Sequence, residues 1–142
     1  MSNQPSERAA IVATVDPFNG NNAATSSDAV DMAKFHEAMF ILALGSIDAV
    51  VDFKLQESDA SGGSYTDITG KAITQLAGTD DNKQAVITIK SEELSTGKRY
   101  VKAVVTVGSG TTSYVCVIGL GMQPRFGPAG NDDLATVAEI VN

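Results

Sequence analysis

The stretch that decides the fold is Lys98–Leu120, which reads KRYVKAVVTVGSGTTSYVCVIGL. Its two halves, Lys98–Val107 and Ser113–Leu120, are rich in β-branched and aromatic residues, a composition that favours strands. Gly108-Ser109-Gly110 between them is typical of a tight turn. We therefore predict a β-hairpin in which Ser113–Leu120 pairs directly with Lys98–Val107.

Outward from this hairpin, the chain repeats the pattern of short apolar segments closed by turn-forming residues. Asp16–Asn22 is dense in turn formers and is expected to break the chain. About eight short strands, Gly-rich turns and at most one helix predict an all-β domain, either a β-sandwich or a barrel. The six further strands that we predict are Ile11–Val15, Thr25–Phe35, Ala38–Leu44, Val50–Glu57, Tyr65–Ile68 and Gln84–Lys90.

Two of these strands carry distinct apolar patterns. Val50–Glu57 alternates, so that Val51, Phe53 and Leu55 share one face. Ala38–Leu44 reads AMFILAL without interruption, which predicts a strand that is buried on both faces.

The two ends of the chain differ from this core. We predict an N-terminal arm over residues 1–10, the sandwich over 11–121 and a C-terminal arm over 122–142. Pro124 and Pro128, with two glycines nearby, argue against regular structure at the start of the C-terminal arm. Apolar residues then recur at helical spacing, which predicts one short helix that includes Leu134 and Val137.

Charge and cysteine content limit the partners. The net charge is −7 and the ten basic residues are scattered, so we expect binding neither to nucleic acid nor to a membrane surface. A single cysteine, Cys116, excludes an intrachain disulfide. The segment Met1–Arg8 lacks the apolar core of a signal peptide, so we expect synthesis and folding in the cytoplasm.

The residues that carry chemistry are few, and we predict no catalytic, cofactor-binding or metal site and no enzyme activity. His36 is the only histidine, and we interpret it as a residue at a strand edge. Cys116 lies among β-branched residues, which is typical of a small core side chain. The acidic loops at 80–82 and 131–133 lack the ligand spacing of a calcium-binding loop and are better explained as turns and caps.

Several motifs nevertheless resemble a known group. The segments Val51–Leu94 and Gly97–Ala129 contain K-x-I-T-Q-L at 71–76, Y-V-x-A-x-V-T-V-G at 100–108 and P-R-F-G-P at 124–128. Together with D-M-A-K-F-H at 31–36, these signatures resemble the capsid decoration, or cement, proteins of tailed bacteriophages.

This resemblance implies a jelly-roll-like β-sandwich on the exterior of the virion capsid. There it would cement neighbouring copies of the major capsid protein and associate with itself as a homodimer or homotrimer. Within the C-terminal arm, Arg125 can bond a carboxylate and Phe126 can fill an apolar pocket. We consider equally that this segment folds back on its own domain. The predicted protein–protein contacts are Pro124, Arg125, Phe126, Pro128, Leu134 and Val137.

A second resemblance gives the alternative function. Gln56–Asp59 followed by Tyr65–Ile68 is similar to a hairpin of carbohydrate-binding and immunoglobulin-like sandwiches. It implies a glycan- or host-surface-binding module of a phage tail or fibre. The chain has no tryptophan on which a sugar ring could stack, which weakens this alternative.

Overall fold

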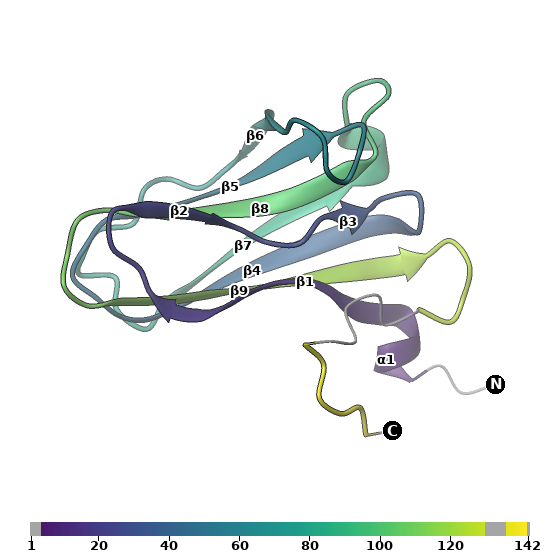
Figure 1. Ribbon diagram of the computed structural model, residues 1–142. Coiled ribbons are helices and arrows are strands. Elements are labelled where there is room, and N and C mark those ends of the chain that lie inside the picture. Colours follow the sequence, from purple (N-terminus) through teal and green to yellow (C-terminus); the bar gives the residue numbers. More distant parts are fainter. Residues whose placement is uncertain (1–3, 130–135, 142) are drawn as a thin grey trace.

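Two antiparallel β-sheets pack face to face and form the two layers visible in Figure 1. This computed structural model describes residues 4–129 and 136–141. The strand order is β1-β9-β4-β7 in one sheet and β2-β8-β5-β6 in the other, where β3 also pairs with β8. The elements are α1 (Pro5–Arg8), β1 (Ala9–Asn19), β2 (Ala23–Ser26), β3 (Val30–Asp31), β4 (Phe35–Ile47), β5 (Val51–Ser58), β6 (Thr66–Ala72), β7 (Gln84–Lys90), the 3₁₀ turn η1 (Ser91–Glu93), β8 (Tyr100–Val107) and β9 (Ser113–Pro124).

The connectivity is that of a jelly roll. Strands β5 and β6 are sequential partners in one sheet, whereas most other connections cross from one sheet to the other. The last strand, β9, returns to lie between β1 and β4, and β8 lies between β2 and β5. Two Greek keys interlocked in this way define the jelly roll. The prediction of an all-β sandwich is therefore confirmed.

The predicted hairpin at the C-terminal end is wrong. Both halves of the stretch are strands, but β8 pairs with β5 and β9 pairs with β1 and β4, so the two belong to opposite sheets. The turn at Gly108 is the corner between the layers. A Cβ at Gly108 would lie 2.8 Å from a methyl carbon of Val50, so glycine allows this close approach.

The core lies between the sheets and is filled by alternate residues of each strand. Val51, Phe53 and Leu55 of β5 are buried, as their alternation predicts. Opposite them, Phe40 and Leu42 of β4 are fully buried. Other side chains that are almost completely enclosed are Phe35, Ile89, Val30, Val101, Val105, Val107 and Val115.

Strand β1 is longer than predicted at both ends. It begins at Ala9, inside the segment that we assigned to an N-terminal arm, and Ala10 is buried in the core. It also continues through Asp16 and Pro17, where we expected a turn. The register shifts between Val15 and Phe18, and β1 is an edge strand, so a proline is tolerated there.

The predicted strand Thr25–Phe35 is in fact divided among three elements. Thr25 lies in β2, Val30 and Asp31 form β3, and Phe35 is the first residue of β4. The interpretation of Ala38–Leu44 as buried on both faces also requires correction. Its inward residues, such as Phe40, are buried, but the outward side chains of Met39 and Ile41 are only half-buried.

The C-terminal arm begins later than predicted, because β9 continues to Pro124. Residues 136–141 are not helical, and the rest of the predicted helix, including Leu134, lies outside the described residues. Within the described ranges, no helix has both the length and the apolar character needed to cross a membrane. The N-terminal turn α1 and residues 136–141 lie at the same end of the sandwich (Figure 1).

Candidate protein-binding surfaces

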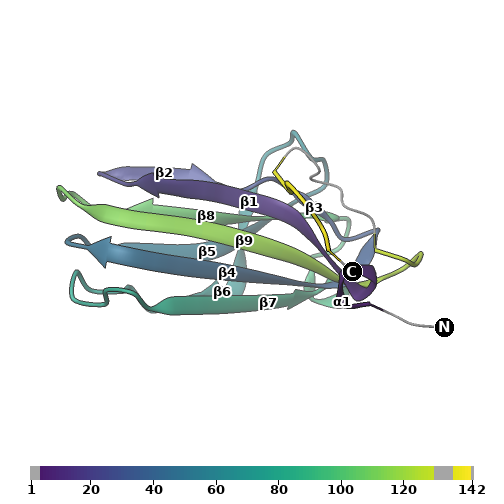
Figure 2. The same ribbon diagram turned by 90° about the horizontal axis from the view of Figure 1, so that it is seen from below.

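The outer faces of the two sheets differ sharply in polarity. Figure 2 views the sandwich from the side of the β1-β9-β4-β7 sheet. We call the outward side of this sheet the apolar face and define it by its residues. They are Ile11 and Thr14 of β1, Tyr114, Cys116, Ile118 and Leu120 of β9, Met39, Ile41 and Ala43 of β4, and Gln84, Val86 and Thr88 of β7. At one end of the sheet, Glu37, Met122 and Lys90 form a charged row that borders this face.

Strand register brings these residues together in rows. Ile41 in β4 pairs with Ile118 on one side and with Val86 on the other, so three aliphatic side chains lie abreast. The next row places Met39 beside Leu120. Val86 of the edge strand β7 is 52% exposed and Ile118 of the inner strand β9 is 41% exposed, so this row presents a contiguous apolar surface to solvent.

The outer face of the other sheet is polar. Asp67 of β6 accepts hydrogen bonds from Lys54 at 2.9 Å and from Gln56 at 2.8 Å. The hydrogen bond from Lys54 and, to a smaller extent, the hydrogen bond from Gln56 lower the pKa of the Asp67 carboxyl. The ammonium group of Lys102 lies 4.2 Å from the centre of the Tyr65 ring. This face therefore resembles an ordinary solvated surface.

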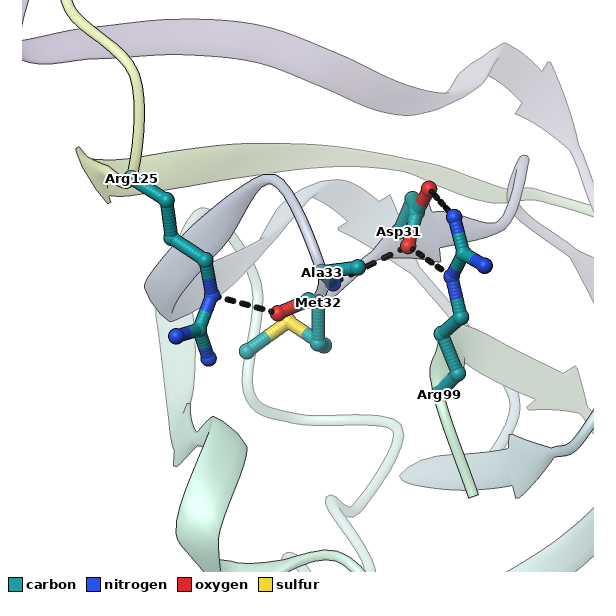
Figure 3. A network of polar contacts seen from close by, with 5 residues as sticks. All are labelled: Asp31, Met32, Ala33, Arg99 and Arg125. Atoms are coloured by element: carbon teal, nitrogen blue, oxygen red, sulfur yellow. Dashed lines mark hydrogen bonds and ion pairs between the residues drawn. The ribbon is translucent and has the colours of Figure 1, made fainter. Parts of the chain in front are cut away.

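The C-terminal loop, Pro124–Pro128, is held against the sandwich by Arg125. The Nε of Arg125 donates to the Met32 carbonyl at 3.2 Å (Figure 3), and its Nη2 donates to Ser91 Oγ at 2.9 Å. The backbone N–H of Arg125 also donates to the Lys34 carbonyl at 2.9 Å. For Arg125, the structure thus matches the interpretation that the segment folds back on its own domain.

A second arginine fixes the same corner from the other side. Arg99 makes a bidentate ion pair with Asp31, with N–O distances of 2.7 and 2.8 Å (Figure 3). This hydrogen bonding lowers the pKa of Asp31, whose Oδ1 also accepts from the Ala33 N–H. The turn between β3 and β4 is therefore a rigid base for the loop that Arg125 attaches to it.

Phe126, by contrast, points away from the chain. Its side chain is 84% exposed, although both neighbouring parts of the loop are attached. Pro124 is half-buried at the end of β9, Pro128 is exposed, and the Ala129 N–H donates to the Glu7 carbonyl at 2.9 Å. The sequence analysis predicted that Arg125 and Phe126 both contact a partner. In the structure, Arg125 instead bonds its own domain, and only the Phe126 ring is directed outward.

The remaining predicted contact, Val137, is half-buried on this domain. It lines a shallow pocket with Pro5 of α1, Ile11 of β1 and Leu120 of β9. The pocket lies at the edge of the apolar face, so this part of the C-terminal segment covers one corner of it.

The residues considered for chemistry lie apart from one another. His36 is exposed near the start of β4. Cys116 is half-buried on the apolar face, not in the core as we predicted, because β9 alternates and directs Val115 and Val117 inward instead. Asp80 in the acidic loop at 80–82 accepts hydrogen bonds from the Ala77 N–H and from Lys83.

A polar cluster joins the β4–β5 connection to the β8–β9 connection, and the sequence analysis did not predict it. Asp48 Oδ2 accepts from both the backbone N–H and the hydroxyl of Thr111, at 2.8 and 2.6 Å. These bonds lower the pKa of Asp48 to about 2. Fully buried Ser113 donates to Asp48 Oδ1 and accepts from the Ala49 N–H. The cluster fixes the corners between strands and has a structural role.

No family model and no curated protein matches the chain. Among solved structures, it is similar to a CBM4 carbohydrate-binding module, with 8% identity, 75% of this chain and 70% of that chain covered, and a TM-score of 0.48. It is also similar to a pilus protein of Bacillus endospore appendages, with 12% identity, 87% and 97% covered, and a TM-score of 0.39. At these values the likenesses carry no argument about function.

Proposed function

We propose that this chain is a structural protein that acts by binding other proteins, specifically as a cement protein on the outer surface of a tailed-phage capsid. The observation that carries the proposal is the C-terminal loop, in which Arg125 is anchored inward while Phe126 is 84% exposed. An aromatic ring held outward on a rigid base is the form that binding hot spots take at protein interfaces.

The anchoring matters for affinity as well as for geometry. Arg125 makes hydrogen bonds to Met32, Lys34 and Ser91, so much of the ordering of this loop is complete before any partner binds. Loops that are ordered in advance lose less conformational entropy on association. Phe126 can therefore contribute most of its burial free energy to a pocket on the major capsid protein.

The charge of the chain is compatible with a position outside the shell. A net charge of −7 disfavours contact with packaged DNA, which is a polyanion. A protein that attaches in many copies, each touching more than one capsid subunit, also gains from effective concentration, so each contact can be modest.

The test uses capsid shells that lack this protein. Wild type and Phe126→Ala are added to the shells, bound protein is measured by co-sedimentation, and shell resistance to heat is recorded. We expect Phe126→Ala to weaken binding by about tenfold or more. Its melting temperature when free should change little, because a highly exposed side chain contributes at most about 0.5 kcal/mol to folding.

The matched control is Val50→Ala, which removes an exposed apolar side chain at the β4–β5 corner. This variant should bind shells as the wild type does. Failure of the wild type to bind or to protect any such shell would refute the capsid role. Equal binding by wild type and Phe126→Ala would refute the role of the loop.

The alternative, a glycan- or host-surface-binding module of a tail or fibre, is favoured by the polar outer face around Tyr65. Gln56 and Asp67 lie on the same sheet and could bond sugar hydroxyls, but Lys102 stacks on the Tyr65 ring. A glycan array gives the test. Binding that is lost in Tyr65→Ala would support this alternative, and an array without hits would exclude it for the glycans tested.

A further inference from the structure

We propose that the apolar face binds the apolar face of a second copy of this chain, so that two sandwiches stack through their β1-β9-β4-β7 sheets. This inference goes beyond the proposed function, because it concerns a different surface from the C-terminal loop and does not require a capsid. Four observations support it. They are the composition of the apolar face, the protected edges of its sheet, the area of the face, and the absence of like charges that would oppose a second copy.

The composition of the face is that of an interface core. The strand residues in its central rows include none of Asp, Glu, Lys, Arg or His, and Glu139 of the C-terminal segment lies beside Ile11 and Leu120 at the covered corner. These rows are Ile11, Leu120, Met39 and Thr88, then Thr14, Ile118, Ile41 and Val86, then Cys116, Ala43 and Gln84. Charged residues are depleted in the same way at the centres of protein interfaces. The outer face of the other sheet serves as an internal comparison, because charged Asp52, Lys54 and Lys102 lie on it.

The edges of the sheet are protected against pairing, which leaves its face as the surface for association. At the β1 edge, the carboxylate of Asp28 accepts the Thr14 N–H at 3.2 Å. At the β7 edge, Lys71 donates to the Thr88 carbonyl at 2.8 Å and forms an ion pair with Glu93 at 2.9 Å. Side chains that cover backbone groups in this way are a common defence against edge-to-edge association.

The extent of the face matches the lower limit for a specific dimer. Four strands spaced about 4.8 Å apart, followed from Tyr114 to Met122 at about 3.4 Å per residue, cover about 500 Å², which includes the charged row at Met122 and the corner beside Val137. Two copies together would therefore bury at most about 1,000 Å², which is near the minimum for a specific interface. We therefore expect a dimer with a micromolar dissociation constant.

The face is also compatible with itself. Two copies that each carry a charge of −7 repel one another, but the central rows bring no like charges into contact. A two-fold axis uses the same patch on both partners and closes the assembly at two copies. Sheet faces stack about 10 Å apart in β-sandwiches, as the two sheets of one copy already do here.

The test is the oligomeric state of the isolated protein, measured by sedimentation equilibrium from about 1 to about 300 μM, a range that brackets a micromolar constant. Ile118→Glu places two carboxylates in the centre of the proposed interface and should raise the dissociation constant by on the order of a hundredfold. Thr106→Glu adds the same charge to the outer face of the opposite sheet, beside Asp52, and should leave the constant unchanged.

A second variant and a second readout keep the test independent of folding defects. Val86 lies on an edge strand and is 52% exposed in the wild type, and Val86→Glu should likewise raise the dissociation constant by on the order of a hundredfold. Cys116, the single cysteine, lies within the interface, so its rate of modification by a thiol reagent should fall as the wild-type concentration rises. In the folded Ile118→Glu variant, this fall in rate should begin only at about a hundredfold higher protein concentration.

A wild type that stays monomeric through this range would overturn the proposal. A dissociation constant left at its wild-type value in both Ile118→Glu and Val86→Glu, or trimers that depend on these residues, would also overturn it. These results are separable from the capsid test, because shell binding depends on Phe126 and can fail while the dimer forms.

Discussion

Gly119 in β9 offers a sharp test of how tightly neighbouring side chains pack on the inner face of the β1-β9-β4-β7 sheet. A Cβ at this position would lie 2.8 Å from Cε1 of Phe40 and 3.0 Å from Cβ of Ala13, and both neighbours are fully buried. Overpacking against two enclosed groups should cost about 2–3 kcal/mol, near the upper part of the usual range. Alanine restricts the unfolded chain more than glycine does and returns about 0.5–1 kcal/mol.

The net loss expected for Gly119→Ala is therefore about 2 kcal/mol, which for a domain of this size lowers the melting temperature by about 8 °C. Urea denaturation followed by circular dichroism measures this loss directly. Gly62→Ala is the matched control, because no atom lies within 4 Å of the added methyl group and its stability should stay near that of the wild type.

A rescue experiment identifies the cause. In Gly119→Ala combined with Phe40→Leu, the smaller side chain relieves the clash, so the two losses should couple by about 1 kcal/mol or more. A single variant Gly119→Ala as stable as the wild type, or strictly additive losses in the double variant, would show that the Phe40 ring does not press on the β9 backbone.

Two further predictions concern acid stability and aggregation. Because hydrogen bonds from Thr111 hold the pKa of Asp48 at about 2, below its unfolded value near 4, the carboxylate stabilises the fold above about pH 4 and ceases to do so toward pH 2. Asp48→Asn should therefore flatten the fall of the urea midpoint between pH 4 and pH 2, and an unchanged slope would contradict this. Lys71→Ala uncovers the Thr88 carbonyl at the β7 edge, so light scattering should show faster aggregation than in Lys83→Ala, whose lysine pairs with Asp80 in a loop.

Strands in which apolar and polar residues alternate strictly were predicted well, because burial of one face of a strand makes every second residue apolar. The bounds of β7 were predicted to the residue, and its alternation places Ile87 and Ile89 together on the buried face. Strand pairing was not predicted, since alternation says which side chains share a face but not which strand lies alongside. The segments that flank Gly108 were therefore assigned to one hairpin although they belong to opposite sheets.

The candidate binding surfaces could be predicted only in part, for a similar reason. The uninterrupted apolar run at 38–44 indicated burial on both faces, and the structure leaves Met39 and Ile41 on a face that no described part of the chain fully covers. A sequence records that a side chain is apolar, but it does not say whether a core or another molecule covers it. The C-terminal loop was likewise recognised from its prolines, while the opposite directions of Arg125 and Phe126 depend on where β3 and η1 lie.

The hydrogen bond from the Ala129 N–H to the Glu7 carbonyl ties α1 to the segment that directly follows the loop carrying Phe126. A sequence inserted at α1 would therefore lie next to this loop and would obstruct attachment without disturbing the sandwich. Cargo for display is better inserted in the exposed β5–β6 connection around Gly62, where an added side chain meets no neighbour. The choice of fusion site thus decides whether an engineered copy remains able to bind.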